Sequence, residues 1–174
     1  MQNDWLLKIT RVAIIITRIL LIIAGALMAL GIAVVLFASA DAFTTINEGA
    51  AAEGIELTGR AGLGLVFAVG LAAIVLIERF LSLLKQVIDS LPQGDPFVPE
   101  NATRLERMGW LALAMQGLGL LAGIASTQLG TMRDKMEIDV DFSLEGIFLA
   151  LLLFILARVF RKGTEMRDDL EGTV

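Results

Sequence analysis

The fold is decided by the stretch from Ile19 to Ala40, which reads ILLIIAGALMALGIAVVLFASA and contains no charged residue. A helix of these 22 residues would be about 33 Å long, enough to cross a bilayer core of about 30 Å. The stretch therefore predicts a transmembrane helix that begins near Trp5. Ala38-Ser39-Ala40 resembles a signal-peptide cleavage site, but the apolar core of a signal peptide covers only about 7–15 residues. We favour an uncleaved first helix.

Three further apolar runs follow along the chain. The last has the shortest charge-free core, 12 residues between Glu145 and Arg158, so these two side chains are expected near opposite interfaces, extended toward water. The sequence predicts an all-α membrane protein, a single four-transmembrane-helix bundle over residues 1–174. Its approximate spans are 9–40, 61–91 including a cytoplasmic extension, 99–132 and 143–162, followed by a cytoplasmic tail over 163–174.

The distribution of positive charge predicts the orientation of the helices. Eleven of the fourteen Lys and Arg residues lie in the N-terminal segment, the central loop and the tail, which share one side of the membrane. The other three, Arg60, Arg133 and Lys135, lie in the two remaining loops. Because Lys and Arg are enriched in cytoplasmic loops, both termini are predicted to be cytoplasmic. The protein is accordingly predicted to reside in the cytoplasmic membrane.

The two outer loops carry a strand-like pattern. Residues 136–142 read MEIDVDF, in which apolar and polar side chains alternate, and the segment GIELT at 54–58 offers a partner. The pattern leaves open a small extracytoplasmic β-hairpin cap, although an isolated two-stranded hairpin is only marginally stable.

The composition excludes several classes of function. Hydrophobic residues make up 56% of the chain, the mean hydropathy is +0.78, and the chain contains no Cys, His or Tyr. Disulfides, thiolate nucleophiles and the usual general base near neutral pH are therefore absent. No nucleotide-binding, zinc-protease or hydrolase motif occurs on a suitable element. We predict a protein that is not an enzyme and carries no metal or cofactor, and its net charge of −5 argues against direct nucleic-acid binding.

The central cytoplasmic segment is the most informative part of the chain. Apolar residues recur at helical spacing over 80–91, so the second helix is expected to continue beyond the membrane. Gly94 helps to end that helix, and Pro96 and Pro99 bracket Phe97 in an extended elbow. Proline is tolerated in the first turn of a helix, which predicts that the third helix begins near Pro99.

The residues of this segment match a family pattern at Gly94-Asp95-Pro96-Phe97, Glu100-Asn101, Arg104-Leu105 and Gly109. They resemble the signature of domain-of-unknown-function family 2975, bacterial proteins that pair a G-x-P-F turn with an E-N-x-x-R-L helix start. The tail from Phe160 to Val174 also resembles the end of that family. The resemblance implies a four-helix membrane protein of undetermined activity. Genes of the family often lie beside small helix-turn-helix regulators, which implies a cytoplasmic partner of that kind.

The chain departs from the family pattern at one position. Val98 stands where members often carry Ser or Thr, and it cannot cap the following helix through a side-chain oxygen. Asp95 or the side chain of Asn101 would have to substitute for it.

The elbow and the helix after it form a candidate site with two interpretations. The functional one is a polar docking surface for a cytoplasmic protein, and the ordinary one is a helix start whose arginine bonds to the tail. For the ring of Phe97 we favour a plug at the end of its own bundle over an anchor for a partner. The candidate residues are Gly94, Pro96, Phe97, Glu100, Asn101, Arg104 and Arg107.

Glu78, Arg79 and Arg158 are candidates for structural ion pairs near a membrane interface. We expect Arg158 to pair with Glu78 or with Glu106 if the fourth helix packs beside the second or third. Ionisable residues inside spans often mark transport paths, but these lie within a turn or two of a predicted interface. Deeper in the membrane, Gln116 and Gln128 are expected to form interhelical hydrogen bonds.

Small residues recur every four positions in three helices, as in Gly25-Ala29-Ala33, Gly64-Ala68-Ala72 and Gly119-Gly123-Thr127. Such stripes permit close helix contact, within one chain or, as a second interpretation, in a homodimer. Two alternative functions stay open beside a partner-binding membrane module. A small transporter or channel subunit would need a polar cavity lined by Gln116, Ser126 or Thr127, and an accessory subunit would leave a small-residue stripe unpacked.

Overall fold

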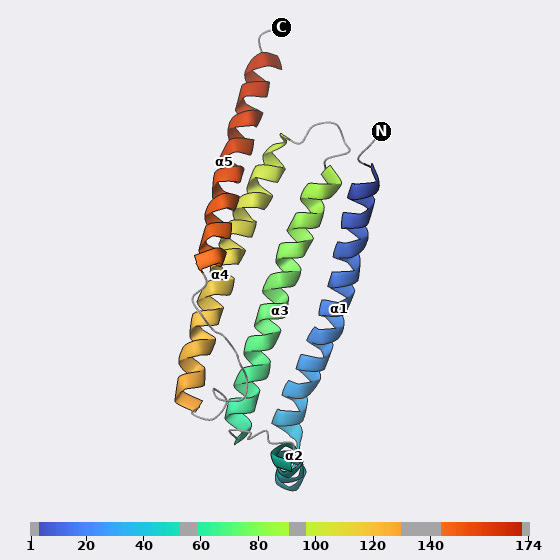
Figure 1. Ribbon diagram of the computed structural model, residues 1–174, viewed down its shortest axis with the longest axis vertical. Helices are drawn as coiled ribbons and strands as arrows, with labels where there is room; N and C mark the ends of the chain where they lie inside the picture. The colour runs from blue at the N-terminus through green and yellow to red at the C-terminus, as the bar shows by residue number, and fades with distance from the viewer. Residues whose placement is uncertain (1–3, 53–58, 91–96, 130–143, 172–174) are drawn as a thin grey trace. The chain divides into compact units, whose positions relative to one another are not determined.

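The computed structural model describes residues 4–52, 59–90, 97–129 and 144–171, and every regular element among them is a helix (Figure 1). The elements are α1 (Asp4–Phe37), α2 (Ala40–Ala52), α3 (Gly59–Ser90), α4 (Pro99–Leu129) and α5 (Leu144–Glu171). The chain divides into two compact units. Among the described residues, the first unit holds the N-terminal part of α1, the C-terminal part of α3, the first half of α4 and all of α5. The second holds α2 and the remaining parts of α1, α3 and α4.

The first unit has an apolar core between α4 and α5. Small and large side chains alternate in it, with Ala112 and Ala150 beside Met108 and Leu153, so the two helices pack closely. Phe80 and other half-buried side chains of α3 cover this core. The ring of Phe154 lies over Gly109, where an added Cβ would come within 2.8 Å of it.

In the second unit, α1 and α3 lie side by side, as Figure 1 also shows. Glycines make the close approach possible, because each leaves room for a side chain of the facing helix. The ring of Phe67 on α3 occupies the space beside Gly31 of α1, and Met28 of α1 lies beside Gly70 of α3. Gly25 of the first small-residue stripe is less restricted, because a Cβ there would lie 3.5 Å from Ile74, an ordinary contact distance.

The short helix α2 was not expected, since the loop from Asp41 to Arg60 carries no apolar run. Ser39 begins it by accepting a hydrogen bond from the Ala42 N–H at 3.2 Å. Arg60 donates hydrogen bonds to the carbonyl oxygens of Ala38 and Ser39, at 2.9 and 2.7 Å, and its guanidinium lies 5.0 Å from the ring centre of Phe43. These contacts join the start of α3 to the α1–α2 junction.

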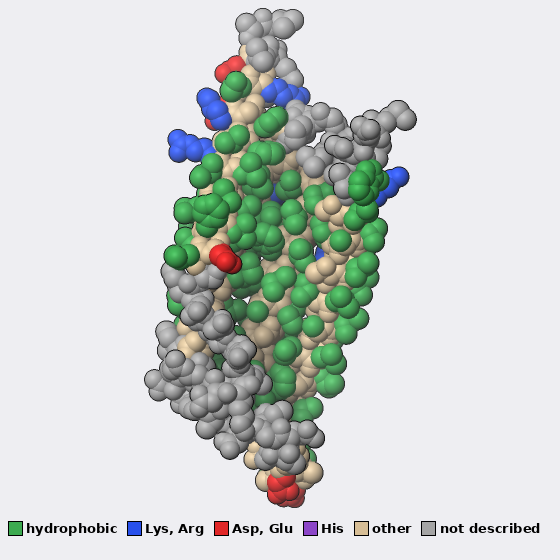
Figure 2. Space-filling view, in the orientation of Figure 1, with side chains coloured by type: hydrophobic (Ala, Val, Ile, Leu, Met, Phe, Trp, Pro, Cys, Tyr) green, Lys and Arg blue, Asp and Glu red, His purple; other side chains and the backbone are tan. Residues whose placement is uncertain are grey.

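Two helices in the described part of the chain, Lys8–Phe37 and Gly59–Ser90, are long and apolar enough to cross a membrane. Only 6% of each apolar window is buried, whereas the core helix of a soluble protein is mostly buried. Figure 2 shows apolar side chains over much of the visible surface. These features are consistent with a membrane protein. The segments predicted as a hairpin, 54–58 and 136–142, lie outside the described residues.

The long helices overlap the four predicted spans, with differences at their ends. The first begins at Asp4, close to the predicted start near Trp5, and α4 begins at Pro99 as predicted. The last helix continues to Glu171 and so includes most of the segment interpreted as a tail. Salt bridges such as Lys162–Glu165, at 3.0 Å, support the helix there without an apolar run.

Candidate functional site

The elbow residue Phe97 lies against α5. Its carbonyl oxygen accepts a hydrogen bond from the buried hydroxyl of Thr164 at 3.1 Å, and its ring centre lies 5.2 Å from that of Phe160. The ring also covers Gly163, where a Cβ would come within 2.6 Å of it. The proline-bracketed ring therefore joins the start of α4 to the C-terminal half of α5. Gly94 and Pro96 lie outside the described residues.

Asn101 is completely buried in the first turns of α4. Its amide group donates a hydrogen bond to the hydroxyl oxygen of Ser90 at 2.7 Å, and its carbonyl oxygen accepts one from Arg104 at 2.7 Å. Ser90 in turn donates to the carbonyl oxygen of Val87 at the end of α3. One buried amide thus connects the end of α3 to the start of α4, because a buried polar group must find partners.

A different part of the same helix faces outward. Glu100, Thr103 and Arg107 are exposed and lie at i, i+3 and i+7, which places them on neighbouring positions of one helix face. Arg104 is half-buried and engaged with Asn101. The residues of the predicted docking surface therefore fall into two groups. Asn101 and Arg104 form contacts within the chain, and Glu100 and Arg107 remain exposed.

Ion pairs join α1 to α3 in the first unit. Arg18 donates to both carboxylate oxygens of Glu78, with a shortest distance of 2.6 Å, and both side chains are about a quarter exposed (30% and 26%). Arg11 contacts Asp89 at 2.8 Å in the last turn of α3. There, beyond the apolar run, a hydrogen bond from Lys85 lowers the pKa of Asp89, and the positive charges of Lys85 and Arg11 act in the same direction.

The expected ion pairs have different partners in the structure. Glu78 pairs with Arg18, and Glu106 pairs with Arg161 at 2.6 Å. Arg158 lines a cavity beside Glu106, yet neither Arg158 nor Arg79 forms an ion pair within the described residues. The one-turn shift from Arg158 to Arg161 depends on the rotation of α5 against α4, which no local pattern encodes.

Gln116 packs directly over Gly146 of α5, where a Cβ would come within 1.6 Å of its amide nitrogen. The side chain of Gln128 lies outside the described ones. Sequence reasoning missed Ser90 and Thr164, the hydroxyl partners of the elbow. The sequence signal for these two residues is weak, because single hydroxyls near helix ends are common. Most of them hydrogen-bond only to the backbone of their own helix.

The elbow supplies hydrogen-bonding and charged groups. Among the described residues, no three acidic, His or Cys side chains come together where they could hold a metal ion. The polar groups of the elbow are mutually satisfied, and the exposed ones are ordinary charged side chains. These contacts position α3, α4 and α5 of the first unit against one another.

Comparison with known proteins places the chain in a family. The model of the family described as "Protein of unknown function (DUF2975)" matches residues 37–174, which include the elbow, Asn101, Arg104 and the whole of α5. No curated protein and no solved structure matches the chain. Because the match covers well over half of the chain, this protein belongs to the DUF2975 family.

Proposed function

We propose that the protein is a non-enzymatic, four-span protein of the bacterial cytoplasmic membrane that binds a cytoplasmic protein partner. Both termini lie in the cytoplasm, and the partner docks on the exposed face of α4 formed by Glu100, Thr103 and Arg107. The partner is of the class of small helix-turn-helix regulators. The main observation that supports the membrane location is the exposed apolar surface of the long helices.

Exposed large apolar side chains recur along most of α1. Its exposed large side chains include Ile9, Val12, Ile15, Ile16, Ile19, Leu20, Ile22, Ile23, Leu27 and Leu30. Soluble monomers rarely expose apolar patches above a few hundred Å², because each Å² left in water forgoes about 25 cal/mol. Hydrocarbon chains would remove that cost. The helix α5 adds Phe148, Leu151, Ile155 and Val159 to the exposed apolar surface.

The absence of cysteine makes the topology directly testable. We expect Glu48→Cys, in α2, to react with a membrane-impermeant maleimide in intact spheroplasts. Thr103→Cys, at the start of α4, should react only after the membrane is permeabilised, because the side rich in Lys and Arg stays in the cytoplasm. Labelling is measured by the mass shift of the purified chain.

Full reactivity of Thr103→Cys in intact spheroplasts would reverse the proposed orientation. Equal reactivity of both variants without permeabilisation, together with recovery of the chain in the detergent-free fraction, would exclude a membrane-spanning protein. The unsubstituted chain is the control, since any labelling of it must come from a group other than a thiol.

The docking surface is supported by what the elbow leaves accessible. Asn101 is buried and hydrogen-bonded within the chain, whereas Glu100 and Arg107 are exposed on α4. The gene neighbours implied by the family resemblance support the choice of a small regulator as partner. A helix face with charges of both signs suits a complementary protein surface better than a nucleic acid.

We expect a photo-crosslinking residue at Thr103 to capture a small helix-turn-helix regulator that is co-expressed with this protein. Arg107→Glu should weaken that capture about ten-fold, since one charge contact at an interface rim is reversed. The matched control is Arg79→Glu, which reverses one exposed arginine of α3 away from the proposed face. Capture that is unchanged by Arg107→Glu, or reduced equally by both reversals, would contradict the docking surface.

The transporter alternative stays a prediction. A transport path would need polar groups that water or a solute can contact. The described core of the first unit consists of apolar side chains, among them Leu105, Met108, Ala112 and Leu153. Gln116 packs over Gly146, and the side chains of Ser126 and Thr127 lie outside the described ones.

A further inference from the structure

A cavity lies between α4 and the C-terminal half of α5, with a volume of about 790 Å³. Its walls carry five charged side chains: Glu106, Arg158, Arg161, Lys162 and Glu165. Phe154 and Ala157 supply the apolar part of the lining. All of these residues belong to the first unit, so the cavity is a feature of one compact unit.

The charges of the cavity do not cancel. Arg161 pairs with Glu106 at 2.6 Å, and Lys162 pairs with Glu165 at 3.0 Å. Arg158 is left over, with no ion pair or hydrogen bond within the described part of the chain. The cavity therefore holds one unbalanced positive charge, on a guanidinium whose planar fork suits two phosphate oxygens.

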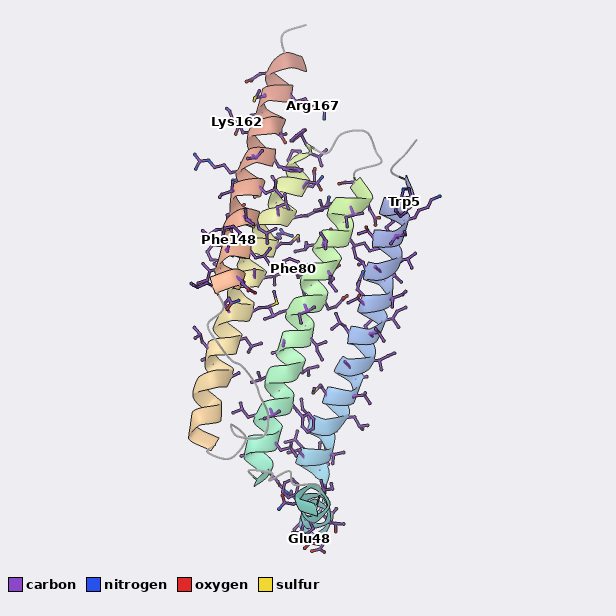
Figure 3. All side chains as sticks on the ribbon, in the orientation of Figure 1. Trp5, Glu48, Phe80, Phe148, Lys162 and Arg167 are labelled. Atoms are coloured by element: carbon purple, nitrogen blue, oxygen red, sulfur yellow. The ribbon has the colours of Figure 1, made fainter. Side chains whose placement is uncertain are left out.

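The cavity also lies where the surface of α5 changes from apolar to charged. Large exposed apolar side chains continue from Phe148 to Val159, and charged residues become frequent from Arg158 onward. Figure 2 shows this change along α5, and Figure 3 labels Phe148 in the apolar stretch and Lys162 in the charged one. In a membrane protein, such a boundary lies at the level of the lipid phosphates.

An aromatic side chain near the cavity also indicates that the cavity lies at the membrane–water interface. Trp110 of α4 is 61% exposed, and its ring contacts the edge of Phe154, with ring centres 5.4 Å apart. Tryptophan is enriched at the membrane–water interface, because its ring is apolar and its N–H is polar. Phe154 joins Trp110 to the cavity, since it also lines the cavity wall.

We infer that this cavity binds the phosphodiester headgroup of an anionic phospholipid, with Arg158 as the main phosphate ligand. A phosphodiester carries one negative charge, which balances the unpaired guanidinium. The acyl chains would lie along the exposed apolar side chains of α5, below the headgroup. The inference rests on the proposed membrane location of the chain, and it adds a lipid ligand that the proposed partner binding does not require.

A free phosphate ion would satisfy Arg158 alone, whereas a phospholipid would also cover the adjoining apolar surface. Basic pockets between transmembrane helices on the cytoplasmic side are a known setting for anionic lipid headgroups. The location of the cavity at the edge of the apolar surface therefore favours the lipid as the source of the phosphate.

The two tryptophans of the chain provide a test. In a Trp5→Phe background, Trp110 is the single tryptophan, and its fluorescence is quenched by brominated lipids that occupy the neighbouring site. The chain is reconstituted in vesicles containing brominated phosphatidylglycerol or brominated phosphatidylcholine. We expect phosphatidylglycerol to be preferred about five-fold, the factor that one cation near a membrane surface supplies.

Arg158→Gln should reduce that preference to near equality, and Arg79→Gln, which removes an arginine that does not line the cavity, should preserve it. Equal losses in the two variants would indicate diffuse attraction between the membrane and the protein, and would overturn the cavity as a site. An excess of inorganic phosphate should leave the quenching unchanged. If inorganic phosphate abolishes the preference, the site takes a soluble ion and the lipid assignment is wrong.

The remaining outcomes separate this inference from the proposed function. Equal quenching by both lipids in the unsubstituted cavity would overturn the lipid site and leave the membrane location standing. Absence of quenching by either lipid would mean that Trp110 is not in contact with the bilayer, which would overturn the membrane location and the lipid site together.

Discussion

Replacing Asn101 by alanine is expected to lower the free energy of unfolding by about 3 kcal/mol. The amide is completely buried and satisfies Ser90 on one side and Arg104 on the other. Its removal leaves these two groups without that partner and opens a small cavity between α3 and α4. We expect a lower midpoint in thermal or SDS unfolding of the protein in mild detergent, followed by circular dichroism.

Thr103→Ala is the matched control, two residues further along the same helix. Thr103 is exposed, and its hydroxyl donates a single hydrogen bond to the carbonyl oxygen of Pro99 within its own helix. Its loss should cost less than about 0.5 kcal/mol, as is usual for surface substitutions. If Asn101→Ala unfolds at the same midpoint as Thr103→Ala, the buried amide does not connect α3 and α4 in the way that the structure indicates.

Gly109→Val is expected to destabilise the first unit by about 3 kcal/mol through overpacking. A Cβ at this position would lie 2.8 Å from the Phe154 ring, closer than carbon atoms approach, and valine adds two methyl groups beyond it. The ring must move, and it contacts Trp110 at an angle of 71°. We therefore expect both a lower unfolding midpoint and a shift in the emission of Trp110, measured in a Trp5→Phe background.

Gly117→Val serves as the control because it makes the same substitution in the same helix. Apart from Gly117, its chain neighbours and the nearby backbone of its own helix, no described atom lies within 4 Å of the position that a Cβ would take there. Valine and glycine differ by only a few tenths of a kcal/mol in helix propensity, so we expect a change within about 0.5 kcal/mol. Equal effects at the two positions would show that the contact with Phe154 does not limit the packing of α4 against α5.

Helix α2 shows how a local pattern can be misread. Residues 41–60 are acidic and lie between two apolar runs, so the sequence predicts a loop there. The structure has a 13-residue helix there, with Ser39 as its cap. Serine is itself a frequent helix N-cap, and this local start signal does not require a long apolar run.

The candidate site shows a second limit of prediction from the sequence. The proline-bracketed ring of Phe97 and the E-N-x-x-R-L helix start could be recognised along the chain. The internal role of Asn101 could not, because an asparagine near a helix start is ordinarily exposed. The partners Ser90 and Thr164 lie 11 and 67 residues from the groups that they contact, and no spacing rule connects positions so far apart.

By itself the sequence determined that the chain is made of long apolar helices, where α4 begins, and which family the chain resembles. These are properties of neighbouring residues, since hydropathy, proline and capping act over one or two helical turns. Only the tertiary structure decided that Glu78 pairs with Arg18, that Glu106 pairs with Arg161, and that Arg158 is left facing a cavity. The reason is geometric: a helix turns by about 100° per residue, so a small rotation or a shift of one turn exchanges the side chains that meet between helices.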